Sequence, residues 1–155
     1  MTSDRLVYTA QSKQYFYCRD AVCEYVFNRG AVPLNPFRAF DYFLGDRVPR
    51  AQIRVANRRL LEASDEVWIF GEQLADGVLI EIAQAMELGK PLRYFTIDNQ
   101  ADQIEEVEPQ RLDFEAQVSK ETGLEREQLL GHLMAGTTRQ VVQALGRHSE
   151  VRGSR

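Results

Sequence analysis

The stretch from residue 64 to residue 91, SDEVWIFGEQLADGVLIEIAQAMELGKP, decides the fold. Its four consecutive apolar residues, Val67 to Phe70, have high strand preference and do not alternate with polar ones, which is typical of a parallel strand covered on both faces. A loop over residues 71–77 follows, and then a helix that Gly89-Lys90-Pro91 ends. The inward stripe of this helix is Val78, Ile82, Ala85, Met86 and Leu88. The stretch therefore predicts a central strand followed by a helix that packs on the sheet.

Strand-like and helical segments alternate on both sides of this stretch. Strands are predicted at residues 5–10, 31–34 and 92–97, and helices at residues 15–30, 37–44 and 50–63. Such alternation implies βαβ crossovers, which place strands in parallel. The predicted fold class is α/β, with an open, mainly parallel, doubly wound sheet of the Rossmann or flavodoxin type and a C-terminal helical extension.

The chain has the length of one ordinary domain, 155 residues, and we divide it by composition. Residues 1–97 form the predicted α/β core, and residues 98–108 read as an acidic surface linker. Residues 109–147 are predicted to be helices of the same domain, at 109–121 and 124–146, with the second bent near Gly136-Thr137. Residues 148–155 are a polar tail.

Composition excludes several classes of function. No window approaches the roughly 18 apolar residues of a membrane span, and no signal peptide is visible, so a cytoplasmic protein without membrane contact is expected. The net charge of −4 argues against a nucleic-acid partner. Cys18 and Cys23 are interpreted as small core residues. With only His132 and His148 available, no metal site or cofactor is predicted, and acid–base chemistry must fall to carboxylates.

The predicted ligand site lies at the carboxyl ends of the strands, where the loops into the helices gather in open parallel sheets. The loop at 71–77 ends in Asp76-Gly77, and Glu81 follows in the first turns of the helix. Glu81 is three residues after Val78 and four before Ala85, so its carboxylate falls beside the sheet-facing stripe. The alternative is that Glu81 only complements the helix dipole, as acids commonly do in a first turn.

The stretch resembles the nucleoside 2-deoxyribosyltransferase-like superfamily, which includes nucleotide N-glycosidases. The matching positions are Asp65 before the apolar strand, Asp76 with Gly77 in the loop, and Glu81 in a helix that ends in Gly-Lys-Pro. The resemblance implies that Glu81 is a nucleophile that attacks the anomeric carbon of a nucleoside. It further implies that Asp76 and Asp65 orient the sugar or handle protons.

The resemblance covers roughly residues 5–97 and extends more weakly to Tyr8 in the first strand and to the Asn35-Pro36 turn, which makes Tyr8, Asn35 and Gly77 candidate substrate-binding residues. The bulky run Val78-Leu79-Ile80 replaces the glycine-rich approach of the family. An alternative function is therefore a non-catalytic nucleotide-binding or sensing module of the same fold.

Further candidates come from residue type and position. Tyr15 or Phe16 could stack on a base, although one of them is expected in the core. Ser12, Lys13 and Arg19 lie where a helix N-terminus could hold a phosphate. The expected partner is thus a small-molecule nucleoside or nucleotide, with Ser12, Tyr15 and Arg19 in contact with it.

Two surfaces can each be interpreted in two ways. The arginines in the helix at 50–63 are most simply a solvated face, namely Arg50, Arg54, Arg58 and Arg59. The alternative is that they reach a substrate or a partner. The apolar faces of residues 124–145 exceed what a core of 97 residues needs for cover, so a homodimer or larger homo-oligomer is expected. The alternative is that these faces pack across an edge of their own sheet.

Overall fold

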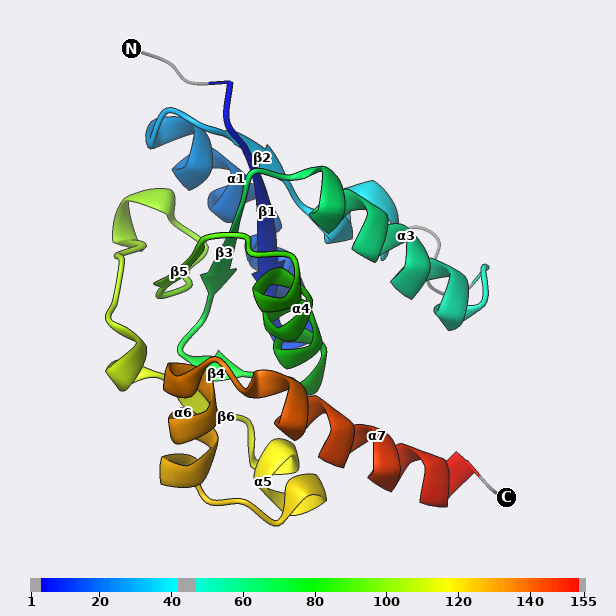
Figure 1. The fold of residues 1–155 in the computed structure, drawn as a ribbon. Coiled ribbons are helices and arrows are strands. Elements are labelled where there is room, and N and C mark those ends of the chain that lie inside the picture. Colours follow the sequence, from blue (N-terminus) through cyan, green and yellow to red (C-terminus); the bar gives the residue numbers. More distant parts are fainter. Residues whose placement is uncertain (1–3, 42–46, 154–155) are drawn as a thin grey trace.

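The computed structural model describes residues 4–41 and 47–153 and is built around a parallel sheet (Figure 1). Four strands pair in parallel in the order β2-β1-β3-β5. They are β1 (Leu6–Gln11), β2 (Val32–Leu34), β3 (Glu66–Phe70) and β5 (Leu92–Phe95). This confirms the open parallel α/β sheet, with the apolar run of β3 between two neighbours.

A second, two-stranded parallel sheet was not predicted. It joins β4 (Gln73–Leu74), inside the loop after β3, to β6 (Asp113–Phe114). The pairing ties the loop that leads to the site to the C-terminal part of the chain.

Helices connect and cover the strands. Before β3 they are the 3₁₀ helix η1 (Lys13–Cys18), α1 (Arg19–Asn28), the π-helical turn η2 (Phe37–Asp41) and α3 (Arg50–Ala63). After β3 they are α4 (Asp76–Glu87), η3 (Ala101–Gln103), η4 (Pro109–Arg111), α5 (Ala116–Thr122), α6 (Arg126–Ala135) and α7 (Thr138–Gly153). The predicted bounds of α3 are confirmed. Of the brief helix predicted at 37–44, Phe43 and Leu44 lie outside the described residues.

The two faces of the sheet bury different sets of side chains, because neighbouring residues of a strand point to opposite faces. Val7, Trp68 and Phe95 pack with α1 on one face. Tyr8 and Ile69 belong to the cluster on the other face, which includes α4 and the C-terminal helices. This arrangement is the doubly wound sheet that the alternation predicted. In the expected stripe of α4, Val78, Ile82 and Ala85 are buried, Met86 is partly buried, and the cap residue Leu88 is 38% exposed.

The C-terminal third differs from its prediction in two places and agrees with it in a third. The helix expected at 109–121 is instead η4, β6 and α5 in succession. The break near Gly136 is confirmed, since Gly136 has a positive φ of 75° and separates α6 from α7. The backbone of the expected polar tail continues α7 as far as Gly153. α7 contacts α4, which it crosses at an angle (Figure 1), and also contacts α5 and α6.

The predicted acidic linker at 98–108 is only partly a surface segment. Its apolar residues Ala101, Ile104 and Val107 are buried, and Val107 donates a backbone hydrogen bond of 2.9 Å to Tyr94 of β5. The charged residues between them point outward and masked this pattern in the sequence. The segment therefore packs against the edge of the sheet.

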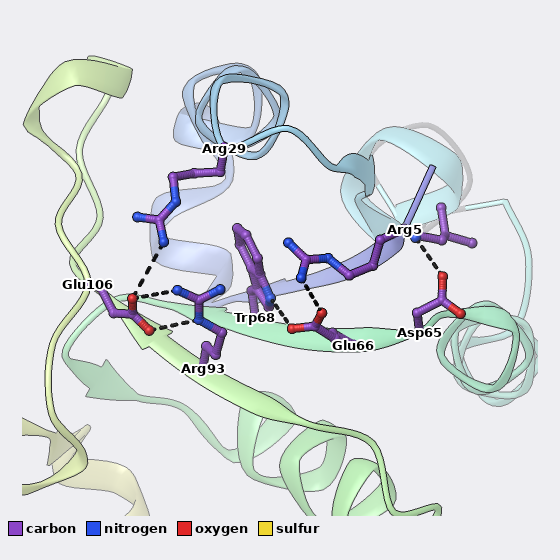
Figure 2. Close-up of polar contacts among 8 residues, drawn as sticks. Arg5, Arg29, Asp65, Glu66, Trp68, Arg93 and Glu106 are labelled. Carbon is purple, nitrogen blue, oxygen red and sulfur yellow. Dashed lines mark hydrogen bonds and ion pairs between the residues drawn. The ribbon is translucent and has the colours of Figure 1, made fainter. Parts of the chain in front are cut away.

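Arg93 and Glu106 hold this segment at the surface (Figure 2). The Arg93 guanidinium makes two hydrogen bonds to the Glu106 carboxylate, of 2.8 and 2.6 Å, and lies 4.9 Å from the centre of the Trp68 ring. Arg29 adds an ion pair of 3.6 Å to the same carboxylate. The hydrogen bond from Arg93 is the main cause that lowers the pKa of Glu106 below its ordinary value.

This lowered pKa predicts a pH-dependent effect of Glu106→Gln. A carboxyl group whose pKa is lower in the folded state stabilises it above the ordinary pKa and stops doing so as the pH falls through the lowered value. Glu106→Gln should therefore cost up to about 1 kcal/mol at pH 7, because the pair is partly exposed to solvent, and less at about pH 3. Urea denaturation at both pH values measures this. Glu105→Gln, next in the chain and exposed, is the control, and an equal cost of Glu106→Gln at both pH values would contradict the prediction.

Gly71, in the loop after β3, and Gly77, in the first turn of α4, should respond oppositely to alanine. Gly71 has φ of +108°, which strains any residue with a Cβ, so Gly71→Ala should lower the free energy of unfolding by about 1–2 kcal/mol. Gly77 has helical geometry, and an added Cβ would meet no atom within 4 Å, so Gly77→Ala should be neutral or stabilising by up to about 1 kcal/mol. Urea denaturation of both variants checks the contrast, which fails if Gly77→Ala is the more damaging change.

No helix in the described residues is both long enough and apolar enough to span a bilayer.

Candidate functional site

A cavity of about 360 Å³ opens beyond the carboxyl end of β1, between α3 and α4. Its walls come from the end of β1 and the loop after it (residues 11–14), and from one side of α3. Ala75, the first three turns of α4, Phe37 and Glu115 complete them. The position agrees with the rule that open parallel sheets bind ligands outside the carboxyl ends of their strands.

Glu81 lies on this cavity and is held from the sheet side. Its carboxylate accepts a hydrogen bond from the hydroxyl group of Tyr8 on β1. Tyr8 is fully buried in the cluster that joins β1 to α4, so its ring cannot move away without disturbing the core. The predicted substrate residue Tyr8 therefore contacts Glu81 and is not part of the cavity wall.

Asp76 and Gly77 form the first turn of α4 and line the same cavity. The Asp76 carboxylate is exposed and accepts a hydrogen bond of 2.7 Å from the backbone N–H of Gly77. The structure thus brings Asp76, Gly77 and Glu81 together on one helix and one cavity.

Asp65 is not brought to this site. It stands before the amino end of β3, is exposed, and accepts a hydrogen bond of 2.8 Å from the backbone N–H of Leu6 (Figure 2). Since β1 and β3 run in parallel, this is the edge of the sheet opposite the cavity. Asp65 joins the two strands at their starts.

Ser12 and Asn35 are both buried, but only Ser12 lines the cavity. The Ser12 hydroxyl caps η1 by accepting from the Gln14 N–H at 3.3 Å, and it donates to the Glu115 carboxylate at 3.2 Å. The Asn35 amide donates to Gln11 at 2.9 Å and its oxygen accepts from the Phe37 N–H at 3.0 Å. Asn35 therefore positions two residues of the cavity wall.

Tyr15 and Arg19 lie outside the cavity wall. The Tyr15 ring is half-buried, while its carbonyl accepts a hydrogen bond of 2.7 Å from Gln11. Arg19 turns toward Phe16, with its guanidinium 5.6 Å from the ring centre. Phe16 is 40% exposed, so the expectation that either Tyr15 or Phe16 would be buried in the core is wrong. Of the three residues predicted to bind a phosphate, Ser12 and Lys13 reach the cavity and Arg19 does not.

Several cavity residues were not among the predicted site residues. Arg50 and Arg54 line it from α3, although the sequence favoured a solvated face. Asn57, one turn further along α3, also lines it. Their spacing of four and three residues, which puts them on one face of the helix, was the available signal.

Glu115 reaches the cavity from just before α5, where its carboxylate accepts from Ser12 and, at 3.1 Å, from the Gln14 amide. No local pattern marked Glu115, because the pairing of β4 with β6 places it.

Sequence comparison assigns the chain to a family. No curated protein is significantly similar to it in sequence. Residues 8–95 match the family described as a domain of unknown function, DUF7768. The match covers more than half of the chain, from β1 to the end of β5, and includes Glu81, Asp76 and the arginines of α3 but not Glu115. The chain therefore belongs to the DUF7768 family.

Proposed function

We propose that the protein cleaves the bond between base and sugar in nucleosides or nucleotides, as an N-glycosidase or a 2-deoxyribosyltransferase with Glu81 as nucleophile. The observation that carries the proposal is the Glu81 carboxylate on the cavity, held by the buried hydroxyl of Tyr8. The resemblance of residues 64–91 to the nucleoside 2-deoxyribosyltransferase-like superfamily supports it. A cavity of about 360 Å³ is also within the size range of small-molecule sites.

The proposed chemistry follows retaining glycosidases. A Glu81 oxygen attacks the anomeric carbon while the bond to the base nitrogen breaks, and the bonding electrons leave with the base, which takes up a proton. Water, or a second base, then attacks the same carbon and releases Glu81. Tyr8 orients the carboxylate, and Asp76, on the same cavity, is placed to orient the sugar or handle the proton. Asp65 has no role in this scheme because it lies at the other edge of the sheet.

The test is an assay of free base over 2′-deoxynucleosides, ribonucleosides and their 5′-monophosphates. Adding a second base separates transfer, which yields a new nucleoside, from hydrolysis, which yields free sugar. The proposal is wrong if no substrate releases base and if Glu81→Ala binds every candidate as well as the unchanged protein does.

The second candidate is a nucleotide-binding or sensing module without turnover. Val78 and Ile80 favour it, because these bulky side chains line the cavity beside Glu81. A sensor should be stabilised against heat by a nucleotide that is recovered intact. Recovery of free base from the same sample excludes the sensor.

The predicted homo-oligomer stays a prediction, and one of its reasons has changed. Leu129, Leu133, Val141 and Leu145 are buried against α4 and its neighbours within one chain. Since these side chains are already buried, they give no reason to expect a partner subunit.

A further inference from the structure

The four arginines of α3 divide into two pairs with different surroundings. Arg58 and Arg59 bind the Glu62 carboxylate, at 3.2 and 3.0 Å. Arg50 and Arg54 line the cavity instead. Within the described part of the chain, neither of these two has an ion-pair partner.

Without a ligand, the position of Arg50 and Arg54 is electrostatically unfavourable for the folded protein. They are four residues apart on one helix, so their charges face the same side and repel each other. They also occupy the first turns of α3, where the helix dipole favours acids, and no acidic residue lies in its first turn. Two cations at this end of a helix do not stabilise the helix, but they can bind an anion.

The charges of the cavity are separated between its walls. Arg50 and Arg54 come from α3, whereas Asp76 and Glu81 come from α4. Near the end of β1, Glu115 adds a third carboxylate and Lys13 a third cation. A ligand that fits this distribution carries its negative charge toward α3 and presents an uncharged or electron-poor centre to Glu81.

We infer that Arg50 and Arg54 form a phosphate-binding subsite, so that the substrate is a nucleotide and not a nucleoside. This inference rests on the proposed function, because that function places the sugar at Glu81. Guanidinium groups bind phosphate oxygens through paired, charge-assisted hydrogen bonds, and two of them match the charge of a phosphate monoester.

The experiment compares each 2′-deoxynucleoside with its 5′-monophosphate. Binding is measured by calorimetry in the Glu81→Gln background, where no ligand is consumed, and base release is measured with Glu81 intact. The variant is Arg50→Gln with Arg54→Gln. The matched control is Arg59→Gln, which removes an exposed arginine of the same helix that does not line the cavity.

The monophosphates should bind far more tightly than the nucleosides. The double variant should weaken monophosphate binding by about a hundredfold, roughly tenfold for each arginine, and leave nucleoside binding unchanged. Arg59→Gln should change neither. Without ligand, the double variant should be at least as stable in urea as the unchanged protein, because it relieves repulsion; a clear loss of stability would show that the arginines are structural and would overturn the inference.

The failure of the inference and that of the proposed function can be told apart. Equal base release from nucleosides and monophosphates, unaffected by the double variant, overturns the phosphate subsite and leaves the glycosidase. Tight monophosphate binding that depends on Arg50 and Arg54, without release of any base, supports the subsite and overturns the glycosidase.

Discussion

Glu81→Gln is expected to lower the rate of base release by about 10⁴-fold, the largest effect on activity that we predict. The amide has nearly the shape of the carboxylate, and its oxygen can still accept the hydrogen bond from Tyr8. It cannot form the glycosyl ester, because an amide oxygen is a far weaker nucleophile than a carboxylate. Folding should therefore be retained while turnover is lost.

Glu87→Gln is the matched control for this prediction, because it makes the same chemical change in the same helix. Glu87 ends α4, is exposed, and lies 3.8 Å from Arg58 across the surface. Its replacement should leave base release unchanged. If Glu81→Gln keeps the rate, or if both variants lose it equally, Glu81 is not the nucleophile. The intact mass of protein quenched during turnover gives a second readout, since the unchanged protein should carry a sugar that Glu81→Gln lacks.

The parts of the fold that could be predicted from sequence are those with a local pattern. The run Val67 to Phe70 identified β3, and the spacing of apolar residues identified α3 and α4. β4 and β6 could not be found in this way, because each has two residues and pairs with a segment about 40 positions distant. In the segment 98–108, buried apolar residues recur every third position, but the surrounding acids dominate the composition.

The same distinction between local patterns and distant contacts applies to the residues of the candidate site. Asp76, Gly77 and Glu81 were found together because one helix start carries all three. The family resemblance implied that Asp65 acts with them, but β3 separates it from them by the full length of the strand. The spacing of Arg50 and Arg54 puts them on one face of α3, but that this face meets the cavity depends on the packing of α3 beside α4, which no local pattern reveals.

Phe95 is the centre of the aromatic cluster on the α1 face of the sheet. It is fully buried, and its ring stacks on Phe70 with centres 4.9 Å apart and an angle of 15° between the planes. The ring centres of Trp68 and Tyr25 lie 5.0 and 5.4 Å from it. Each such aromatic pair adds about 0.5–1.5 kcal/mol to the gain from burial.

Phe95→Ala is therefore expected to lower the free energy of unfolding by about 3–5 kcal/mol, the largest effect on stability that we predict. It removes one ring from three aromatic contacts and leaves a cavity that a sheet strand cannot close. Phe95→Leu keeps most of the apolar volume and should cost clearly less. Phe27→Ala is the control, since Phe27 is 61% exposed on α1 and its loss should change stability by less than about 0.5 kcal/mol. Urea denaturation of the three variants decides the matter: if Phe95→Ala costs no more than Phe27→Ala, the aromatic cluster does not hold α1 on the sheet.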